Sequence, residues 1–193
     1  FRSRPFLVFV TVLDEVAAGI RDRHGVQTRT LAIDLGQPDA AAAIAEATAD
    51  LAIGFLVYCA GADPDFRHFL TNSLATAEAM VQRNCVVPMQ LCHHFASAMV
   101  DRGRGGIVVF GSGAGFVGGP NMVAYGASKA AVKLLTETLY AELRGTNVRV
   151  TVVFPGGVGT DITKNSGVDI PNMPTDSKAA KVTSVTDAGK QIV

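Results

Sequence analysis

The stretch IVVFGSGAGFVGGPNM, residues 107–122, joins an apolar run to a cluster of glycines. The apolar run at residues 107–110 is rich in β-branched side chains and lacks polar alternation, which is typical of a parallel strand covered on both faces. The glycines after it contain G-x-G-x-x-G at residues 113–118, a pattern that occurs in dinucleotide-binding loops. Because open α/β sheets bind ligands at the carboxyl ends of their strands, this stretch predicts a strand that leads into a ligand site.

The rest of the chain alternates between strand and helix patterns. Such repeats favour a parallel, doubly wound α/β sheet in a single domain over residues 1–193. Pro88 falls within the longest helical pattern and predicts a kink or a break there. Residues 156–174 follow neither pattern and are expected to form a long loop or lid on the substrate side. The expected strands are residues 6–12, 26–33, 53–59, 107–110 and 148–154, and the expected helices are residues 13–23, 39–51, 74–100 and 123–144.

The composition argues against several kinds of partner. Hydrophobic residues make up 48% and charged residues 18% of the chain, which is typical of a globular protein. Basic and acidic residues are equal at 17 each, so no basic excess favours nucleic acid or an anionic membrane surface. The longest apolar run, residues 51–62, is too short to cross a bilayer. Cys59, Cys85 and Cys92 have no zinc-ligand spacing and predict reduced core thiols in a cytoplasmic protein.

The sequence around the glycine pattern disagrees with a pyrophosphate site. A pyrophosphate loop needs a helix that begins within the glycines, so that its first amide groups meet the phosphates. Here residues 118–121 are expected to be loop, and the helical pattern begins only near Val123. The acidic residue that should follow about 20 positions later, after a second strand, would fall inside that helix. The sequence therefore favours a loop at a strand end, with the pyrophosphate interpretation as the alternative.

Tyr125 and Lys129 open the clearest helical pattern and are four residues apart. This spacing puts the phenol and the ammonium group on one helical face. A free tyrosine has a pKa near 10, and a neighbouring cation lowers it, so such a pair can act as a general acid or base near neutral pH. Ser112 ends the preceding strand and could bond to the same substrate oxygen. The alternatives are a chance pair of residues and a serine that only caps a turn.

These motifs, taken in order, resemble the short-chain dehydrogenases/reductases, in their smaller single-domain branch, over nearly the whole chain. Ser112, Tyr125 and Lys129 match the catalytic serine, tyrosine and lysine of that family in type and spacing. Asn84, in VQRNCVVP, matches a helix asparagine of the family. The other matches are Asp34-Leu35 after an expected strand, LVYCAGA at residues 56–62, which retains the Ala60-Gly61 of the family's N-N-A-G, and PGGVGT at residues 155–160.

The resemblance implies a Rossmann-like fold and an enzyme in which NAD or NADP exchanges hydride with a carbonyl or secondary alcohol carbon. It implies that Tyr125 exchanges a proton with the substrate oxygen, that Ser112 orients this oxygen, and that Lys129 lowers the tyrosine pKa and binds the ribose. Asn84 would hold a water that links the lysine to solvent. The cofactor-binding residues that the resemblance implies are Asp34, Leu35, Cys59, Ala60, Gly61, Tyr125, Lys129, Pro155, Gly156, Val158 and Thr160.

The chain also departs from the family. Residues 6–12 match the family's second strand, so the first strand with its T-G-x-x-x-G-x-G pyrophosphate turn is absent, as is the last strand. We expect a longer polypeptide to supply them, and without that turn NAD and NADP are not distinguished. Tyr58 and Cys59 replace two asparagines of the family. The alternative functions are a catalytically silent binding or regulatory protein that kept the fold, and another nucleotide-dependent enzyme such as a methyltransferase.

Further expectations concern the metal, the subunits and the substrate. Residues 92–94, Cys-His-His, are adjacent on one expected helix, so their side chains point apart and no metal site is expected. In the family the two long helices, here residues 74–100 and 123–144, pack across a homodimer or homotetramer interface. The small-molecule substrate is expected to be a ketone, a steroid-like molecule or an acyl compound. The apolar side chains expected to line its pocket are Phe116, Val117, Met122 and Met173.

Overall fold

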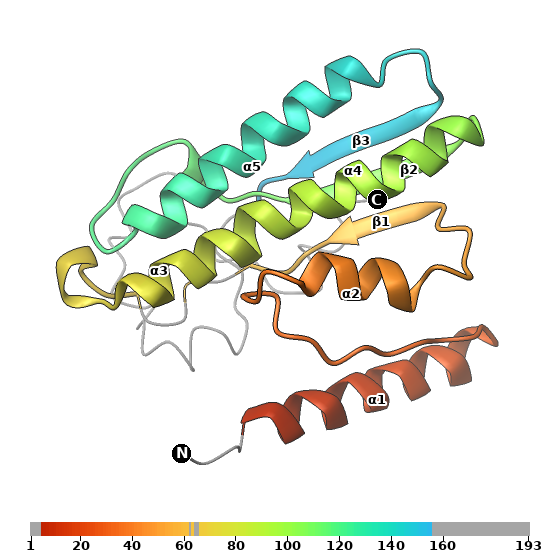
Figure 1. Cartoon of the computed structure of the whole chain (residues 1–193), viewed down its shortest axis with the longest axis horizontal. Helices are drawn as coiled ribbons and strands as arrows, with labels where there is room; N and C mark the ends of the chain where they lie inside the picture. Colours follow the sequence, from red (N-terminus) through yellow and green to blue (C-terminus); the bar gives the residue numbers. More distant parts are fainter. Residues whose placement is uncertain (1–4, 62, 64–65, 156–193) are drawn as a thin grey trace. The chain divides into compact units, whose positions relative to one another are not determined.

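The computed structural model describes residues 5–61, 63 and 66–155, with side chains from residue 12 onward (Figure 1). The chain divides into two compact units, of which the first ends at Asp34 and the second begins at Leu35. The first unit carries a helix, and the second carries the sheet and most of the candidate site residues. One domain over residues 1–193 stays a prediction, and the loop or lid at residues 156–174 lies outside the described residues.

The described part of the first unit begins with α1 (Pro5–His24). This helix includes the expected helix at residues 13–23, but it also covers residues 6–12, where the prediction of a strand was wrong. An α-helix satisfies its own backbone hydrogen bonds, whereas a strand needs a partner alongside it. No proline or glycine separates the two patterns, so the helix continues through both. The match of residues 6–12 to a second strand therefore has no support in the secondary structure.

Residues 26–33 also form no strand, so this prediction was wrong as well. No strand is described elsewhere in the same unit, and the segment has no ladder to join. Side chains hold it to α1 instead. Nη1 of Arg21 donates to Oγ1 of Thr28 (2.6 Å), and Oγ1 of Thr30 donates to Oδ1 of Asp14 (3.1 Å).

The second unit contains a parallel three-stranded sheet, with its strands in the order in which they occur in the chain. Leu56, Ile107 and Val150 lie side by side in the register. The central strand is buried, with Ile107 and Val109 each 1% exposed, as its continuous apolar pattern predicts. Three of the five predicted strands are thus confirmed. They are β1 (Phe55–Tyr58), β2 (Gly105–Phe110) and β3 (Val148–Val153).

Helices connect these strands and pack against them. In Figure 1, α4 and α5 run side by side in front of the strands, and both contact β3. The three helical patterns predicted beyond residue 38 are confirmed. The helices are α2 (Ala40–Ala47), α3 (Leu74–Val81), the π-helical turn η2 (Gln82–Val86), α4 (Val87–Asp101) and α5 (Val123–Glu142), with short 3-10 turns at η1 (Phe69–Thr71) and η3 (Gly113–Gly115).

The parallel arrangement determines where a ligand site can form. All three strands end at the same edge of the sheet, because their directions are the same. Cys59, Gly111 and Phe154 are the first residues beyond these three ends.

Of the helices that the structure describes, none is both long enough and apolar enough to cross a bilayer.

The long helical pattern at residues 74–100 is interrupted just before Pro88. In the π turn η2, the N–H of Val87 bonds to the C=O of Gln82, five residues earlier rather than four. Proline has no N–H and its ring crowds the preceding turn, so the distortion precedes Pro88. Pro88 itself fits the first turn of α4, because N–H groups in that turn have no acceptor within α4 itself. The predicted break is confirmed.

Val132→Ala tests the packing of α5. Val132 is 0% exposed, so its truncation should lower the free energy of unfolding by about 2 kcal/mol, through lost transfer energy and an unfilled cavity. The matched control is Val123→Ala in the same helix, where the side chain is 55% exposed and a change below ~0.5 kcal/mol is expected. Urea unfolding measures both losses, and equal losses would contradict this packing.

Candidate functional site

Lys129 is the charged residue at the centre of the candidate site, and it is almost inaccessible to solvent. Its side chain is 2% exposed, and Nζ donates to the C=O of Phe110 (2.9 Å), the last residue of β2. Burial lowers the pKa of the ammonium group because the charged form loses hydration, while the nearby Cys59 acts in the opposite direction. An ammonium group has three N–H donors, so Nζ can serve further acceptors besides Phe110.

Tyr125 lies one turn before Lys129 on α5, as their spacing predicts. Nζ of Lys129 is 5.9 Å from the centre of the Tyr125 ring. The tyrosine is half-buried, whereas the lysine is buried. The pair therefore places a phenol at the margin of the protein interior, with a positive charge behind it.

Ser112 follows β2 and caps the 3-10 turn η3. Its Oγ accepts a hydrogen bond from the N–H of Ala114 (3.2 Å). The capping role that the sequence left open is thus present. It uses the hydroxyl as an acceptor, so the hydroxyl hydrogen stays available to another acceptor.

The glycine pattern at residues 113–118 has a packing role at one of its positions. A Cβ on Gly115 would lie 2.9 Å from the backbone C and O of Lys129, so only glycine lets η3 approach α5 this closely. Gly113 and Gly118 have open space instead. No α-helix begins within the pattern, because α5 starts at Val123, as predicted. The geometry is that of a turn packed on a helix, not of a helix N-terminus facing a phosphate.

Asn84 lies in the π turn and is 1% exposed. Its Nδ2 donates to Oγ of Ser128 (3.2 Å), and this hydroxyl donates to the C=O of Tyr125 (2.8 Å). A chain of hydrogen bonds therefore joins the π turn to the first turns of α5. Oδ1 of Asn84 is buried and has no hydrogen-bond partner in the part of the chain that the structure describes.

Gly61 brings Asn84 and Lys129 together at the end of β1. A Cβ on Gly61 would lie 2.8 Å from Nζ of Lys129 and 3.1 Å from Oδ1 of Asn84. The backbone here has φ +146°, a conformation that favours glycine. An amide oxygen and an ammonium group thus both face the same α-carbon, and any side chain at this position would push them away.

The three cysteines have different environments. Cys92 is buried, as predicted, and Cys85 is half-buried. Cys59 is exposed, so the prediction of a core thiol was wrong for this residue. It is the first residue after β1 and lies at the carboxyl end of the strand, beyond the part that pairs with β2.

The remaining predicted cofactor residues are only partly described. Ala60 is half-buried beside Gly61, and Pro155 is the last described residue after β3. Asp34 ends the first unit, and Leu35 begins the second. Gly156, Val158 and Thr160 lie outside the described residues.

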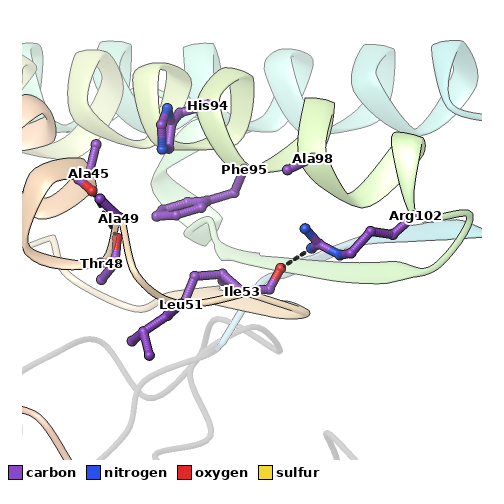
Figure 2. Close-up of a pocket in the computed structure, with 9 residues that line it drawn as sticks. All are labelled: Ala45, Thr48, Ala49, Leu51, Ile53, His94, Phe95, Ala98 and Arg102. Carbon is purple, nitrogen blue, oxygen red and sulfur yellow. Dashed lines mark hydrogen bonds between the residues drawn. The ribbon is translucent and has the colours of Figure 1, made fainter.

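Two other features of the second unit lie apart from this cluster. His93 and His94 are exposed, and no described group of three or more His, Cys, Asp or Glu residues could hold a metal ion. Residues of α2, of α4 and of the segment after α2 line a hollow of about 290 Å³. Phe95 and Arg102 are among the side chains that line it (Figure 2). Arg102 reaches back to donate to the C=O of Ile53. None of the predicted site residues lines this hollow.

Ser128 is a residue of the candidate site that the sequence patterns did not predict. It is 2% exposed and links Asn84 to the backbone of Tyr125. Its position three residues after Tyr125 puts it near the same helical face, which is the signal that could have included it. Its bond to Asn84 joins residues 44 positions apart and could not be read from local spacing.

The family model described as short chain dehydrogenase matches residues 10–170. The chain is 30% identical over 170 residues to the 7beta-hydroxysteroid dehydrogenase of Collinsella aerofaciens. This match covers 88% of this chain and 63% of that protein. The chain is 29% identical over 176 residues to the human very-long-chain 3-oxoacyl-CoA reductase, over 87% of this chain and 55% of that protein. The chain thus spans less than two thirds of the length of either relative.

Solved structures agree with the sequence matches. A short-chain dehydrogenase from Sphingobium yanoikuyae in complex with NADPH is similar with a TM-score of 0.83 and 30% identity, over 93% of this chain and 68% of that chain. A structure of a 7beta-hydroxysteroid dehydrogenase has a TM-score of 0.72 and 32% identity, over 76% and 56% of the two chains. The predicted Rossmann-like α/β fold is therefore confirmed.

Gly115→Ala tests the close approach of η3 to α5. The added Cβ would lie 2.9 Å from backbone atoms of Lys129, so unfolding should become easier by about 1–3 kcal/mol. Gly118→Ala is the matched control, because nothing lies within 4 Å of its added Cβ. Urea unfolding compares the two variants. A Gly115→Ala protein as stable as the control would show that the turn packs differently.

Cys59 should react with an aromatic disulfide reagent at about pH 8 well before the other two thiols. Burial raises the pKa of Cys85 and raises that of Cys92 to about 11, so both stay largely protonated under these conditions. Absorbance of the released thiolate counts the thiols in the native and the urea-unfolded protein. Cys59→Ser should abolish the fast phase, and a fast phase that persists in this variant argues against the exposure described.

Proposed function

The chain belongs to the short-chain dehydrogenase family, and we propose that it is an NAD(P)-dependent oxidoreductase acting on a carbonyl or secondary alcohol substrate. The observation that carries the proposal is the pair of Tyr125 and Lys129, whose ammonium group is buried at the carboxyl edge of the sheet. Burying a charge is costly, and such groups gather at functional sites. Here the charge of Lys129 lies near the Tyr125 phenol, which has an exchangeable proton.

In the proposed reaction Tyr125 is the general acid or base. Its phenol gives a proton to the carbonyl oxygen during reduction and takes one from the hydroxyl group during oxidation. Lys129 supplies positive charge 5.9 Å from the ring centre, where negative charge develops on the phenol oxygen. Ser112 donates its hydroxyl hydrogen to the substrate oxygen and orients it, while its Oγ still accepts from Ala114.

The residues around Lys129 fit a nicotinamide nucleotide. Nζ of Lys129 has N–H donors in addition to the one that bonds to Phe110, and these donors suit the hydroxyl groups of a ribose. Gly61 has no side chain that would occupy the space beside Nζ. When bound, the nicotinamide ring supplies or accepts the hydride. NAD and NADP are both candidates, and the relative bound to NADPH supports the choice of cofactor class. The proposed contacts are Cys59, Ala60, Gly61, Tyr125, Lys129, Leu35 and Pro155, with Asp34, Gly156, Val158 and Thr160 proposed from the sequence.

Asn84 is proposed to sustain the proton supply. Its Oδ1 is buried without a described partner, and Nζ of Lys129 faces the same α-carbon of Gly61. A water that accepts from the ammonium group and donates to the amide oxygen would satisfy both groups. Such a water would carry protons between Lys129 and solvent as Tyr125 turns over.

The proposed substrate is an apolar ketone or the corresponding alcohol. Phe116 and Val117 follow the turn that Ser112 caps and are 56% and 73% exposed. The Phe116 and Phe154 rings pack edge to face, with their centroids 4.8 Å apart. This pair forms an apolar surface near the strand ends. Relatives named as a 7beta-hydroxysteroid dehydrogenase and a very-long-chain 3-oxoacyl-CoA reductase support a steroid-like or acyl compound.

A homodimer or homotetramer in the cytoplasm is proposed as the working form. Its interface would use α4 and α5, which carry exposed apolar side chains. Met89 on α4 is 45% exposed and Leu134 on α5 is 61% exposed. Apolar side chains presented by neighbouring helices favour burial against another subunit.

Tyr125→Phe in the full-length protein tests the acid-base role. Loss of the phenol hydroxyl should lower kcat by about 100-fold or more while nicotinamide nucleotide binding persists. Turnover is followed by NADPH or NADH absorbance with a panel of apolar ketones, and binding by cofactor fluorescence. Tyr140→Phe removes the hydroxyl from an exposed tyrosine on the same helix and should change neither quantity.

Each alternative outcome has a defined meaning. A wild-type protein that binds neither cofactor rejects the oxidoreductase proposal. It favours the alternative function of a catalytically silent binding or regulatory protein. Cofactor binding without turnover of any carbonyl in the panel rejects the proposed substrate class. Full turnover in Tyr125→Phe rejects the role of that residue alone.

A further inference from the structure

The π turn η2 contains the C=O of Arg83, and the residue that would donate to it in a continued π-helical pattern is a proline. The N–H of Val87 bonds to the C=O of Gln82, five residues earlier. The same pattern one residue further along would join the C=O of Arg83 to residue 88. That residue is Pro88, which has no N–H. The amino acid that marks the break in the helix thus also removes a donor from the turn.

Tyr58 provides a hydrogen for this same carbonyl group. Its hydroxyl donates to the C=O of Arg83 at 2.5 Å, across 25 positions of the chain. Tyr58 is the last residue of β1 and is 5% exposed. Burial raises the pKa of its phenol well above the ordinary value near 10, so the hydroxyl keeps its hydrogen throughout the working pH range.

We propose that Tyr58 is a positioning residue for Asn84: its hydroxyl replaces the amide hydrogen that Pro88 lacks and fixes the π turn beside Lys129. Arg83, whose carbonyl it binds, directly precedes Asn84 in the chain. The end of β1 therefore holds this asparagine from two directions. The Tyr58 hydroxyl secures the backbone of the turn, and Gly61 lies against Oδ1 of the side chain.

The consequence for the site follows from the contacts of Asn84. Its Nδ2 donates to Ser128, whose hydroxyl donates to the backbone of Tyr125. A turn that moves carries the amide away from both Ser128 and Lys129. The structural part of this inference stands by itself, whereas its effect on turnover rests on the proposed oxidoreductase function.

A double-mutant cycle in the full-length protein tests the inference. Tyr58→Phe keeps the ring and removes only the hydroxyl, and Pro88→Ala returns an amide hydrogen to the turn. If the phenol replaces the missing amide hydrogen, Tyr58→Phe should disturb the turn strongly beside Pro88 and only weakly beside an alanine. Tyr140→Phe, on the exposed face of α5, is the matched loss of a tyrosine hydroxyl.

The first readout does not depend on activity. In the Pro88 background, Tyr58→Phe should speed amide hydrogen exchange of residues 84–87 by about tenfold or more and should move the side-chain amide resonance of Asn84. In the Pro88→Ala background both effects should shrink to the size seen with Tyr140→Phe. An unmoved Asn84 resonance overturns the inference, and so does an equal effect in both backgrounds.

The second readout is kinetic. Tyr58→Phe should lower kcat by about tenfold with the KM for the cofactor unchanged, and should shift the pH profile of kcat, because Asn84 acts on proton supply rather than on binding. In Pro88→Ala, adding Tyr58→Phe should lower kcat much less. A kcat and pH profile equal to those of Tyr140→Phe overturn the catalytic consequence.

The two readouts separate the inference from the proposed function. A wild-type protein without turnover rejects the proposed function, and the exchange and resonance data still decide the role of Tyr58. If Tyr58→Phe fails to fold, Pro88→Ala alone carries the test. The returned amide should weaken the bond from Tyr58 and speed exchange of its hydroxyl hydrogen, and unchanged exchange overturns the inference.

Discussion

The buried ammonium group of Lys129 is the constraint on which the rest of the site depends. A positive charge with 2% exposure must be compensated by polar contacts, and the C=O of Phe110 at the end of β2 provides one at 2.9 Å. Its surroundings must also leave room for it. Gly61 has no side chain to displace Nζ, and Gly115 lets η3 lie directly on the backbone of the same residue. A strand end, a loop and a turn are thus arranged around one lysine.

A distorted helix supplies the other half of the site. The proline at position 88 ends the regular pattern of α3, and the π turn before it carries Asn84 into the interior with 1% exposure. Helical distortions of this kind leave backbone groups that need other partners, and they often occur at functional sites. The bond from Tyr58 connects this turn to β1, so the sheet and the helix are coupled beside the residue that precedes Asn84.

Sequence patterns predicted the second unit better than the first. The strand at residues 107–110 and its two neighbours in the sheet were recognised because buried parallel strands have continuous apolar runs. The same criterion failed at residues 6–12, since a short apolar run fits a helix equally well and periodicity alone does not decide between them. It also failed at residues 26–33, where side-chain bonds to α1 replace a ladder. Cys59 was misjudged because burial at a strand end depends on what lies beside it.

The amino-acid sequence by itself determined the features that depend on residues a few positions apart. These are the shared helical face of Tyr125 and Lys129, the break before Pro88 and the order of strands and helices in the second unit. Only the tertiary structure decided that the lysine is buried, that Oδ1 of Asn84 lies near Gly61 with no partner among the described residues, and that a tyrosine on β1 bonds to the π turn. The physical reason is that helical spacing and the missing N–H of proline act locally, whereas burial and the choice of hydrogen-bond partner depend on segments that are distant in sequence and meet only in the folded chain.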